Sequence, residues 1–132
     1  MPKWTSEQSD AIYKKGTNII VSAGAGSGKT AVLSERVLEH VKSGISIDDL
    51  LVLTFTNAAA AEMKDRIRSK IRKVPELKDE LDKVDLAYIT TFDSFALSLV
   101  KKYSYLVNIS KNINIIDASI IELMKEEVLT NI

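Results

Sequence analysis

The chain has 132 residues, 45% of them hydrophobic and 27% charged, which is typical of one globular domain. Its 18 basic and 18 acidic residues cancel, so overall charge gives no support for nucleic-acid binding, and the absence of cysteine excludes disulfides, cysteine nucleophiles and thiolate metal sites. Residues 1–10 are polar, unlike a signal peptide, and no apolar run approaches the roughly 20 residues of a membrane span, so we expect a cytoplasmic protein.

Strand and helix patterns alternate along the chain. Expected strands are short β-branched apolar runs, and expected helices carry apolar residues at three- and four-residue steps. In chain order we expect a helix over 5–15, a strand over 18–22, a helix over 29–42 with Gly44 at its end, a strand over 50–55, a helix over 57–73, an exposed helix or mobile loop over 75–85, a strand over 86–91, a helix over 92–103, a strand over 113–116 and a helix over 118–129. This order predicts an α/β fold with a parallel sheet covered by helices on both faces.

A glycine-rich segment over 22–30 joins the first expected strand to the next helix. Its glycines permit positive φ angles, so that main-chain N–H groups can surround a phosphate, and the helix adds its positive dipole end. Lys29 would meet the β- and γ-phosphates of a nucleotide, and the Thr30 hydroxyl would bind Mg²⁺. The strict pattern begins with Gly, where this chain has Ala23. The alternative is a turn that only joins strand to helix.

Four ordered motifs carry a resemblance that covers essentially the whole chain. They are W-T-x-E-Q-x-x-A-I, N-I-I-V-S-A-G-A-G-S-G-K-T, L-V-L-T-F-T-N-A-A-A-A-E-M-K and I-T-T-F-D-S-F. They resemble superfamily 1 DNA helicases of the UvrD-like branch, and especially the AddA type of ATP-dependent helicase–nuclease, as does the final stretch over 113–129. In that family the first loop position is commonly Ala. The resemblance implies a P-loop NTPase (RecA-like) motor domain.

The resemblance also implies an ATP and Mg²⁺ site. Gln8 would read the adenine edge, because an amide donates and accepts at once; alternatively it forms a capping box with Thr5, and both roles can coexist. Many relatives have an arginine that packs on adenine where this chain has Ala31, so base recognition would rest more on Gln8. Lys29 would be catalytic and Thr30 the Mg²⁺ ligand. The implied cofactor-binding residues are Gln8, Ala23, Gly24, Ala25, Gly26, Ser27, Gly28, Lys29, Thr30 and Ala31.

Two later motifs match segments that touch single-stranded DNA in the family. Ligands bind at the carboxyl ends of parallel strands, where hydroxyls can hold phosphates and Phe55 could stack on a base. The alternative for that residue is a place in the core, with Asn57 capping the next helix. The implied DNA-contacting residues are Thr54, Phe55, Thr56, Asn57, Thr91 and Ser94.

Asp93 stands where the second DNA motif of the family has histidine. Its carboxylate would repel phosphates, and it could instead be a helix N-cap, with Phe92 and Phe95 in the core. We interpret the basic residues over 64–73 as a solvated face rather than a DNA-facing strip.

Four further residues have simpler interpretations. Trp4 lies near the base or packs the N-terminal segment. His40 is interpreted as a surface residue, and Met63 and Met124 as core residues.

Hydrolysis of ATP needs an acidic motif at the end of a further apolar strand, and no such Asp-Glu pair follows Thr30. Asp117 is the nearest candidate and lacks a neighbouring Glu. The chain ends directly after the last helix, so we expect a truncated motor domain 1A. Residues 1–117 would be part of the ATP-binding domain, and 118–132 the start of a helical insertion (1B-like). Alone, this part is expected to bind nucleotide weakly and not to hydrolyse ATP or unwind DNA.

For the full-length protein the resemblance implies an ATP-dependent DNA helicase with exonuclease activity in double-strand-break repair and recombination. DNA ends would be its substrate, a B-type (AddB) protein its partner, and no membrane is implied. The alternatives are a small P-loop nucleotide kinase and a non-enzymatic nucleotide-binding module. A kinase would need its own acidic Mg²⁺ ligand and an arginine-rich lid, and neither is visible after residue 75.

Overall fold

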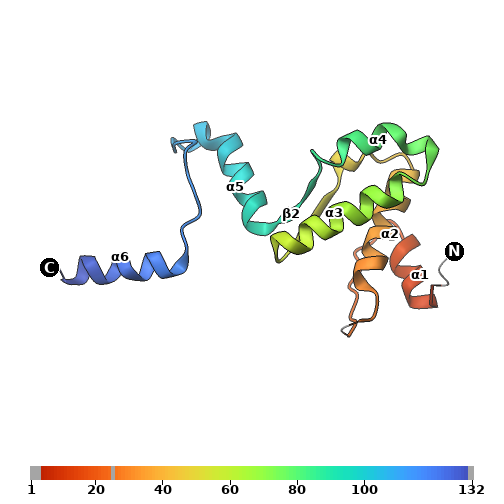
Figure 1. Cartoon of the computed structure of the whole chain (residues 1–132), viewed down its shortest axis with the longest axis horizontal. Coiled ribbons are helices and arrows are strands. Elements are labelled where there is room, and N and C mark those ends of the chain that lie inside the picture. The colour runs from red at the N-terminus through yellow and green to blue at the C-terminus, as the bar shows by residue number, and fades with distance from the viewer. Residues whose placement is uncertain (1–3, 25, 131–132) are drawn as a thin grey trace. The chain divides into compact units, whose positions relative to one another are not determined.

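The computed structural model describes residues 4–24 and 26–130 (Figure 1). The chain divides into two compact units, Met1–Thr91 and Phe92–Ile132. Within the described ranges, no helix has the length and apolar character required to span a membrane. The expected division at residue 117, between a motor domain and a helical insertion, stays a prediction.

The first unit packs helices around a two-stranded sheet (Figure 1). Strands β1 and β2 run parallel, with Leu51 opposite Tyr88 and Thr54 opposite Thr91. Helices α3 and α4 connect them, as a parallel pair requires. The elements are α1 (Ser6–Tyr13), α2 (Lys29–Lys42), η1 (Ile47–Asp49), β1 (Leu51–Thr54), α3 (Asn57–Ile71), η2 (Pro75–Leu77), α4 (Lys78–Lys83) and β2 (Tyr88–Thr91). An α/β fold with a parallel sheet is thereby confirmed in its coarse form.

Local signals set the helix ends. At the start of α3, Thr56 is the N-cap, and its Oγ1 accepts a hydrogen bond from the N–H of Ala59 at 3.1 Å. The interpretation of Asn57 as the cap is therefore wrong by one residue. Helix α2 ends next to Gly44, which has φ 91° and whose N–H donates to the Val41 oxygen at 3.0 Å, so the predicted glycine at this end is confirmed.

The core of this unit lies between α2, α3 and the sheet. Helix α3 buries residues at three- and four-residue steps, Ala60, Met63, Ile67 and Ile71. These residues meet buried side chains from α2 and both strands, including Val41, Val52 and Ile89. The expected core position of Met63 is confirmed.

The predicted strand over 18–22 is wrong. This segment forms no strand, and Ile20 is 96% exposed and Val21 52% exposed. A parallel strand is stable only beside a hydrogen-bonding neighbour. In the described part of the chain, β1 and β2 pair with each other and neither pairs with 18–22.

The second unit consists of α5 (Phe92–Tyr103), η3 (Ser104–Leu106) and α6 (Ala118–Thr130). Both predicted helices are present, but 113–116 forms no strand, so that prediction is wrong for the same lack of a neighbour. Met124 is 55% exposed, which contradicts its expected core position. Asp117 caps α6: its Oδ1 accepts from the Ser119 N–H at 2.9 Å and the Ser119 hydroxyl at 2.6 Å. The side-chain and main-chain hydrogen bonds from Ser119 lower the pKa of Asp117.

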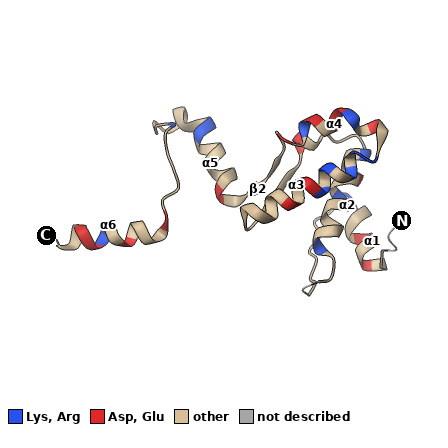
Figure 2. Cartoon of the chain, in the orientation of Figure 1, with Lys and Arg blue, Asp and Glu red and all other residues tan. Residues whose placement is uncertain are grey.

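Acidic partners accompany the basic residues of α3 (Figure 2). Arg66 lies 2.6 Å from Glu62 in an ion pair one turn apart. Arg68 pairs with Asp65 at 2.9 Å. Such exposed pairs favour the interpretation of a solvated face over a DNA-facing strip.

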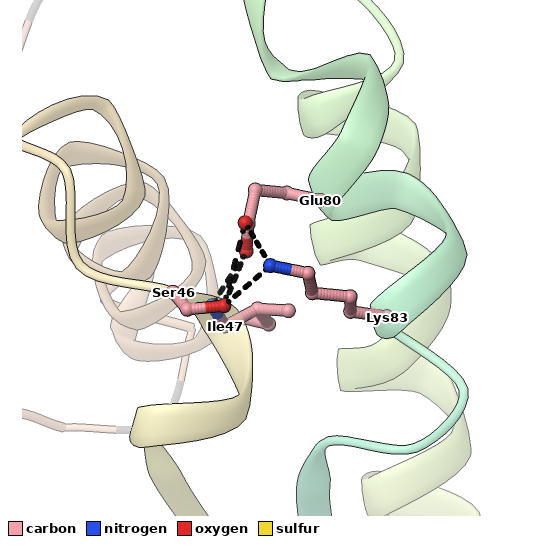
Figure 3. Close-up of polar contacts among 4 residues, drawn as sticks. All are labelled: Ser46, Ile47, Glu80 and Lys83. Carbon is pink, nitrogen blue, oxygen red and sulfur yellow. Dashed lines mark hydrogen bonds and ion pairs between the residues drawn. The ribbon is translucent and has the colours of Figure 1, made fainter.

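A polar cluster ties α4 to η1 (Figure 3). Glu80 accepts from the Ile47 N–H at 2.8 Å, from the Ser46 hydroxyl at 3.0 Å and from the Lys83 ammonium at 2.7 Å. Burial raises the pKa of Glu80, but the hydrogen bonds from Lys83, Ile47 and Ser46 together outweigh it and hold the pKa below its ordinary value of 4.5. The segment 75–85, interpreted as a short helix or a loop, is thus helical and anchored.

Glu80→Gln should make the free energy of unfolding of the chain depend less on pH in acid. A carboxyl group with a lowered folded-state pKa stabilises the fold above its ordinary value of 4.5 and loses that contribution as pH falls through the folded-state pKa. Glutamine does not titrate, so the free energy of unfolding should be lower at neutral pH and fall less steeply with acid. Urea unfolding at several pH values measures this slope. A variant with the slope of the unmodified chain would contradict the prediction.

Candidate nucleotide-binding site

The glycine-rich loop leads directly into α2. Gly26 and Gly28 have φ angles of 75° and 83°, which residues with a Cβ rarely adopt. Gly28 is the N-cap of α2 and offers no side-chain acceptor, so the first N–H groups of the helix are left for an anion. Ala25, one of the predicted cofactor-binding residues, lies outside the described residues.

Lys29 turns its ammonium group into this loop. Its Nζ donates to the carbonyl oxygens of Ala23 at 2.8 Å and Gly24 at 2.6 Å. The loop is closed further by Ser27, whose hydroxyl donates to the Gly24 oxygen at 2.7 Å. A cation at a helix N-terminus opposes the helix dipole, and carbonyl oxygens offset that cost here. Phosphate oxygens could replace these carbonyl groups as the acceptors.

Gln8 connects α1 to the same loop. Its Oε1 accepts from the Thr5 N–H at 3.0 Å, and the Thr5 hydroxyl accepts from the Gln8 N–H at 3.2 Å, which confirms the capping box. The Gln8 Nε2 group donates to the Ser27 oxygen at 3.2 Å. The side chain therefore caps its own helix and contacts the glycine-rich loop at the same time.

A cavity of about 640 Å³ adjoins Gln8 and Lys29. Its wall is mainly apolar and includes Ala11, Val32 and Leu33. This volume is within the roughly 300–1,000 Å³ of small-molecule sites. The predicted residues Gln8, Ala23, Ser27 and Lys29 border it together. Thr30 lies in the first turn of α2 and is exposed.

The first predicted DNA motif follows β1 at its carboxyl end. Phe55 is 95% exposed, so its interpretation as a core residue is wrong. The Thr54 hydroxyl donates to the Thr56 oxygen at 3.0 Å, which shapes the turn into α3. Thr54 pairs in register with Thr91, the last residue of β2, so both motifs begin at one edge of the sheet. Thr91 itself is buried, at 8% exposure.

Comparison with known proteins decides the family. Residues 4–131 match the family described as UvrD/REP helicase N-terminal domain. The chain belongs to this family.

Several similar proteins share one name, that of the A-type subunit of an ATP-dependent helicase/nuclease. The protein from Geobacillus kaustophilus is 46% identical over 137 residues, which cover 96% of this chain and 11% of that protein. The protein from Heliobacterium modesticaldum is 44% identical, covering 99% of this chain and 10% of its own length. The protein from Lactobacillus acidophilus is 43% identical, and the match covers 100% of this chain and 12% of that protein. The chain thus spans about a tenth of the length of these relatives.

The second predicted DNA motif begins at Thr91 and continues along the chain into the second unit. Ser94 and Asp93 lie in the first turn of α5, which begins at Phe92. Asp93 is therefore inside the helix and not its N-cap, and its charge suits the positive end of the helix dipole. Phe92 is 59% exposed and Phe95 is half-buried, so the interpretation of Phe92 as a core residue is wrong.

Trp4 has a structural explanation. It packs on the cluster of Ala11, Ile12 and Val32. The Lys70 Nζ lies 6.0 Å from the centroid of its ring. These contacts support packing of the N-terminal segment as its role.

His40 is half-buried, and its Nδ1 has no hydrogen-bond partner among the described residues, so its interpretation as a surface residue is wrong in part. Burial lowers the pKa of His40, and the charges of Arg36 and Lys15 add to this.

One side chain that borders the cavity beside Gln8 and Lys29 was not identified as a site residue from the sequence patterns. Arg36 fits the helical periodicity of α2, which indicates no binding role for it. In the structure Arg36 lines this cavity together with Gln8 and Lys29. Its Nη1 donates to main-chain oxygens of α1. No local pattern marks such a role, because the acceptors are main-chain atoms more than 20 residues away.

Proposed function

We propose that this chain is the ATP-binding N-terminal part of an ATP-dependent DNA helicase/nuclease. The observation that carries the proposal is the Lys29 ammonium group, held inside a glycine-rich loop that Gln8 also contacts. Membership of the UvrD/REP family and the names of the relatives support it. In this proposal the intact protein acts at DNA ends in break repair and recombination, in the cytoplasm, together with a B-type (AddB) partner.

The proposed fold is a RecA-like P-loop domain, with 1–117 as its first part and 118–132 as the start of a helical insertion. The apolar segment over 18–22 favours this, since it has the composition of a buried strand yet exposes Ile20. Strands supplied by the rest of the intact protein would pair with this segment. The acidic motif needed for hydrolysis would come from the same part, so the chain alone should not hydrolyse ATP.

Each predicted residue has a proposed task in nucleotide binding. Main-chain N–H groups of 23–31 and the start of α2 would hold the phosphates, and Lys29 would leave its carbonyl partners for them. The Thr30 hydroxyl would bind Mg²⁺. The chemistry of this donor set suits a triphosphate, because the loop over 22–30 offers N–H groups and an ammonium and its sequence holds no carboxylate.

The residues that follow β1 are proposed to contact single-stranded DNA. Thr54, Thr56 and Asn57 would meet backbone phosphates through hydroxyl and amide groups, and Thr91 and Ser94 are proposed as further DNA contacts. Phe55 would stack on a base, which its 95% exposure allows.

Phe55→Ala should weaken binding of single-stranded DNA by the intact protein roughly 5- to 100-fold, the range expected for one lost base stack. Fluorescence anisotropy with a labelled oligonucleotide measures the change. Leu86→Ala is the matched control: Leu86 is 82% exposed and precedes β2 at the opposite, amino end of the sheet. An equal loss of DNA affinity in both variants would contradict specific stacking of Phe55 on a base.

The proposed function is tested by calorimetric titration of the intact protein with ATP and Mg²⁺, followed by assays of ATP hydrolysis with and without single-stranded DNA. ATP binding and hydrolysis stimulated by DNA are expected. Hydrolysis that DNA does not change, or transfer of phosphate to a nucleoside monophosphate, would contradict a DNA motor.

A further inference from the structure

Helix α1 takes its position from α2. With eight residues, Ser6–Tyr13, it is shorter than the roughly 12–15 residues that a helix needs to persist alone in water. Its buried residues Ala11 and Ile12 pack with Val32 of α2. The helix that carries Gln8 is therefore supported by the helix that begins at the phosphate loop.

Arg36 holds the carboxyl end of α1. It lies one turn after Val32 on α2, and its Nη1 donates to the main-chain oxygens of Ala11 at 2.7 Å, Lys14 at 2.9 Å and Ile12 at 3.5 Å. Carbonyl groups at a helix C-terminus lack partners within the helix and carry the negative end of its dipole. The last turn of α1 has no basic residue of its own, so Arg36 supplies the cation from the neighbouring helix.

Gln8 lies in the first turn of the same short helix, with its amide over the loop. A Cβ added at Gly28 would lie 3.5 Å from the Gln8 Nε2 atom, so the amide occupies the space beside this glycine. A primary amide has two N–H donors and two acceptor lone pairs. The Ser27 oxygen takes one donor and the Thr5 N–H takes one lone pair. One donor and one acceptor remain, which match N7 and the N6 amino group of adenine.

We infer that Arg36 is a positioning residue for adenine recognition, acting through α1 on Gln8; this rests on the proposed nucleotide site. The helix is only two turns long, so loss of the Arg36 contacts at one end lets α1 tilt or fray and displaces the Gln8 amide at the other. Hydrogen bonds weaken steeply as their angles depart from linear. Phosphate contacts come instead from the loop and Lys29, so base selectivity is lost while phosphate binding is kept.

The test compares affinities of the intact protein for ATP, GTP and inorganic tripolyphosphate. Guanine presents an oxygen where adenine presents an amino group, so GTP reports the loss of the Gln8 acceptor contact. In Arg36→Met the ratio of ATP to GTP affinity should fall about tenfold, as for one lost hydrogen bond, with tripolyphosphate affinity unchanged. Arg36→Lys keeps a cation with donors and should restore much of the ratio.

A double-mutant cycle separates this role from general stabilisation. Gln8→Ala should lower the same ratio. Adding Arg36→Met to it should cause no further fall, because both substitutions remove the same contact between Gln8 and adenine. Arg66→Met is the matched control, since Arg66 lies on α3 and pairs there with Glu62 at 2.6 Å. Its ratio should equal that of the unmodified protein.

Two results would overturn the inference: an unchanged ATP to GTP ratio in Arg36→Met, or equal loss of affinity for ATP, GTP and tripolyphosphate. Should Arg36→Met fail to fold by circular dichroism, Arg36→Gln takes its place, since its uncharged amide removes the positive charge and cannot replace all three contacts to main-chain oxygens. A lowered ratio supports the inference and an unchanged one contradicts it. The proposed function is tested separately, by ATP binding to the unmodified protein. The Arg36 results do not alter the outcome of that test.

Discussion

Lys29→Ala should abolish detectable ATP turnover in the intact protein. The ammonium group now lies 2.8 Å and 2.6 Å from the Ala23 and Gly24 oxygens, inside the loop where the phosphates are proposed to bind. Alanine removes the charge and its donors from the point where charge develops during phosphoryl transfer. Removal of one preorganised donor of this kind lowers kcat by about 10²–10³, and nucleotide affinity should fall as well. Steady-state ATP hydrolysis and calorimetric ATP titration measure both effects.

Lys73→Ala is the matched control for Lys29→Ala. Lys73 is also exposed, and it follows α3 away from the loop, so its removal changes net charge by the same amount. Its turnover should equal that of the unmodified protein. The melting temperatures of both variants should stay unchanged, because surface substitutions usually cost little stability. Full turnover in Lys29→Ala would remove the loop from the mechanism.

Ile67→Ala should destabilise the chain by roughly 3 kcal/mol, within the range of buried isoleucine truncations. Ile67 is 0% exposed and lies in the core formed by α2, α3 and both strands. The loss includes the transfer free energy of the removed methyl groups and the cavity left behind. Such a cost is a large part of the roughly 5–15 kcal/mol that holds a domain folded. Urea unfolding of the 132-residue chain, followed by circular dichroism, measures it.

Ile20→Ala makes the same chemical change at a position that is 96% exposed. In the 132-residue chain it should change the free energy of unfolding by less than about 0.5 kcal/mol. In the intact protein it should cost several times more if, as proposed, further strands cover 18–22. Equal costs for Ile20→Ala and Ile67→Ala in the 132-residue chain would contradict the burial pattern described for the core.

Helices were predictable because their signals are local. The Thr5–Gln8 capping box, the glycine before Lys29 and the one after Ser43 lie within a few residues of the ends they determine. The start of α2 at Lys29 and of α5 at Phe92 agree with the expected positions. The one-residue error at Asn57 arose because Thr56 and Asn57 are both good N-caps, and only the Ala59 contact distinguishes them.

Two strands were not predictable from their residues. The runs over 18–22 and 113–116 have strand composition, yet neither has a neighbouring strand in the described part of the chain. Composition reports what a segment could bury, whereas a strand exists only where a partner supplies hydrogen bonds. The same distinction explains Phe55 and Met124, which are apolar residues that no packed element covers among the described residues.

By itself the sequence determined the helices, the parallel α/β class, the glycine-rich loop before α2 and the family, because each depends on short-range spacing along the chain. Only the tertiary structure decided that the Lys29 ammonium lies within its own loop, that Gln8 spans from its helix to Ser27, and that Arg36 supports α1. These contacts join main-chain oxygens to side chains from other parts of the chain. Every residue has the same main-chain carbonyl group, so the residue types along the sequence do not indicate which carbonyl group a side chain will bind.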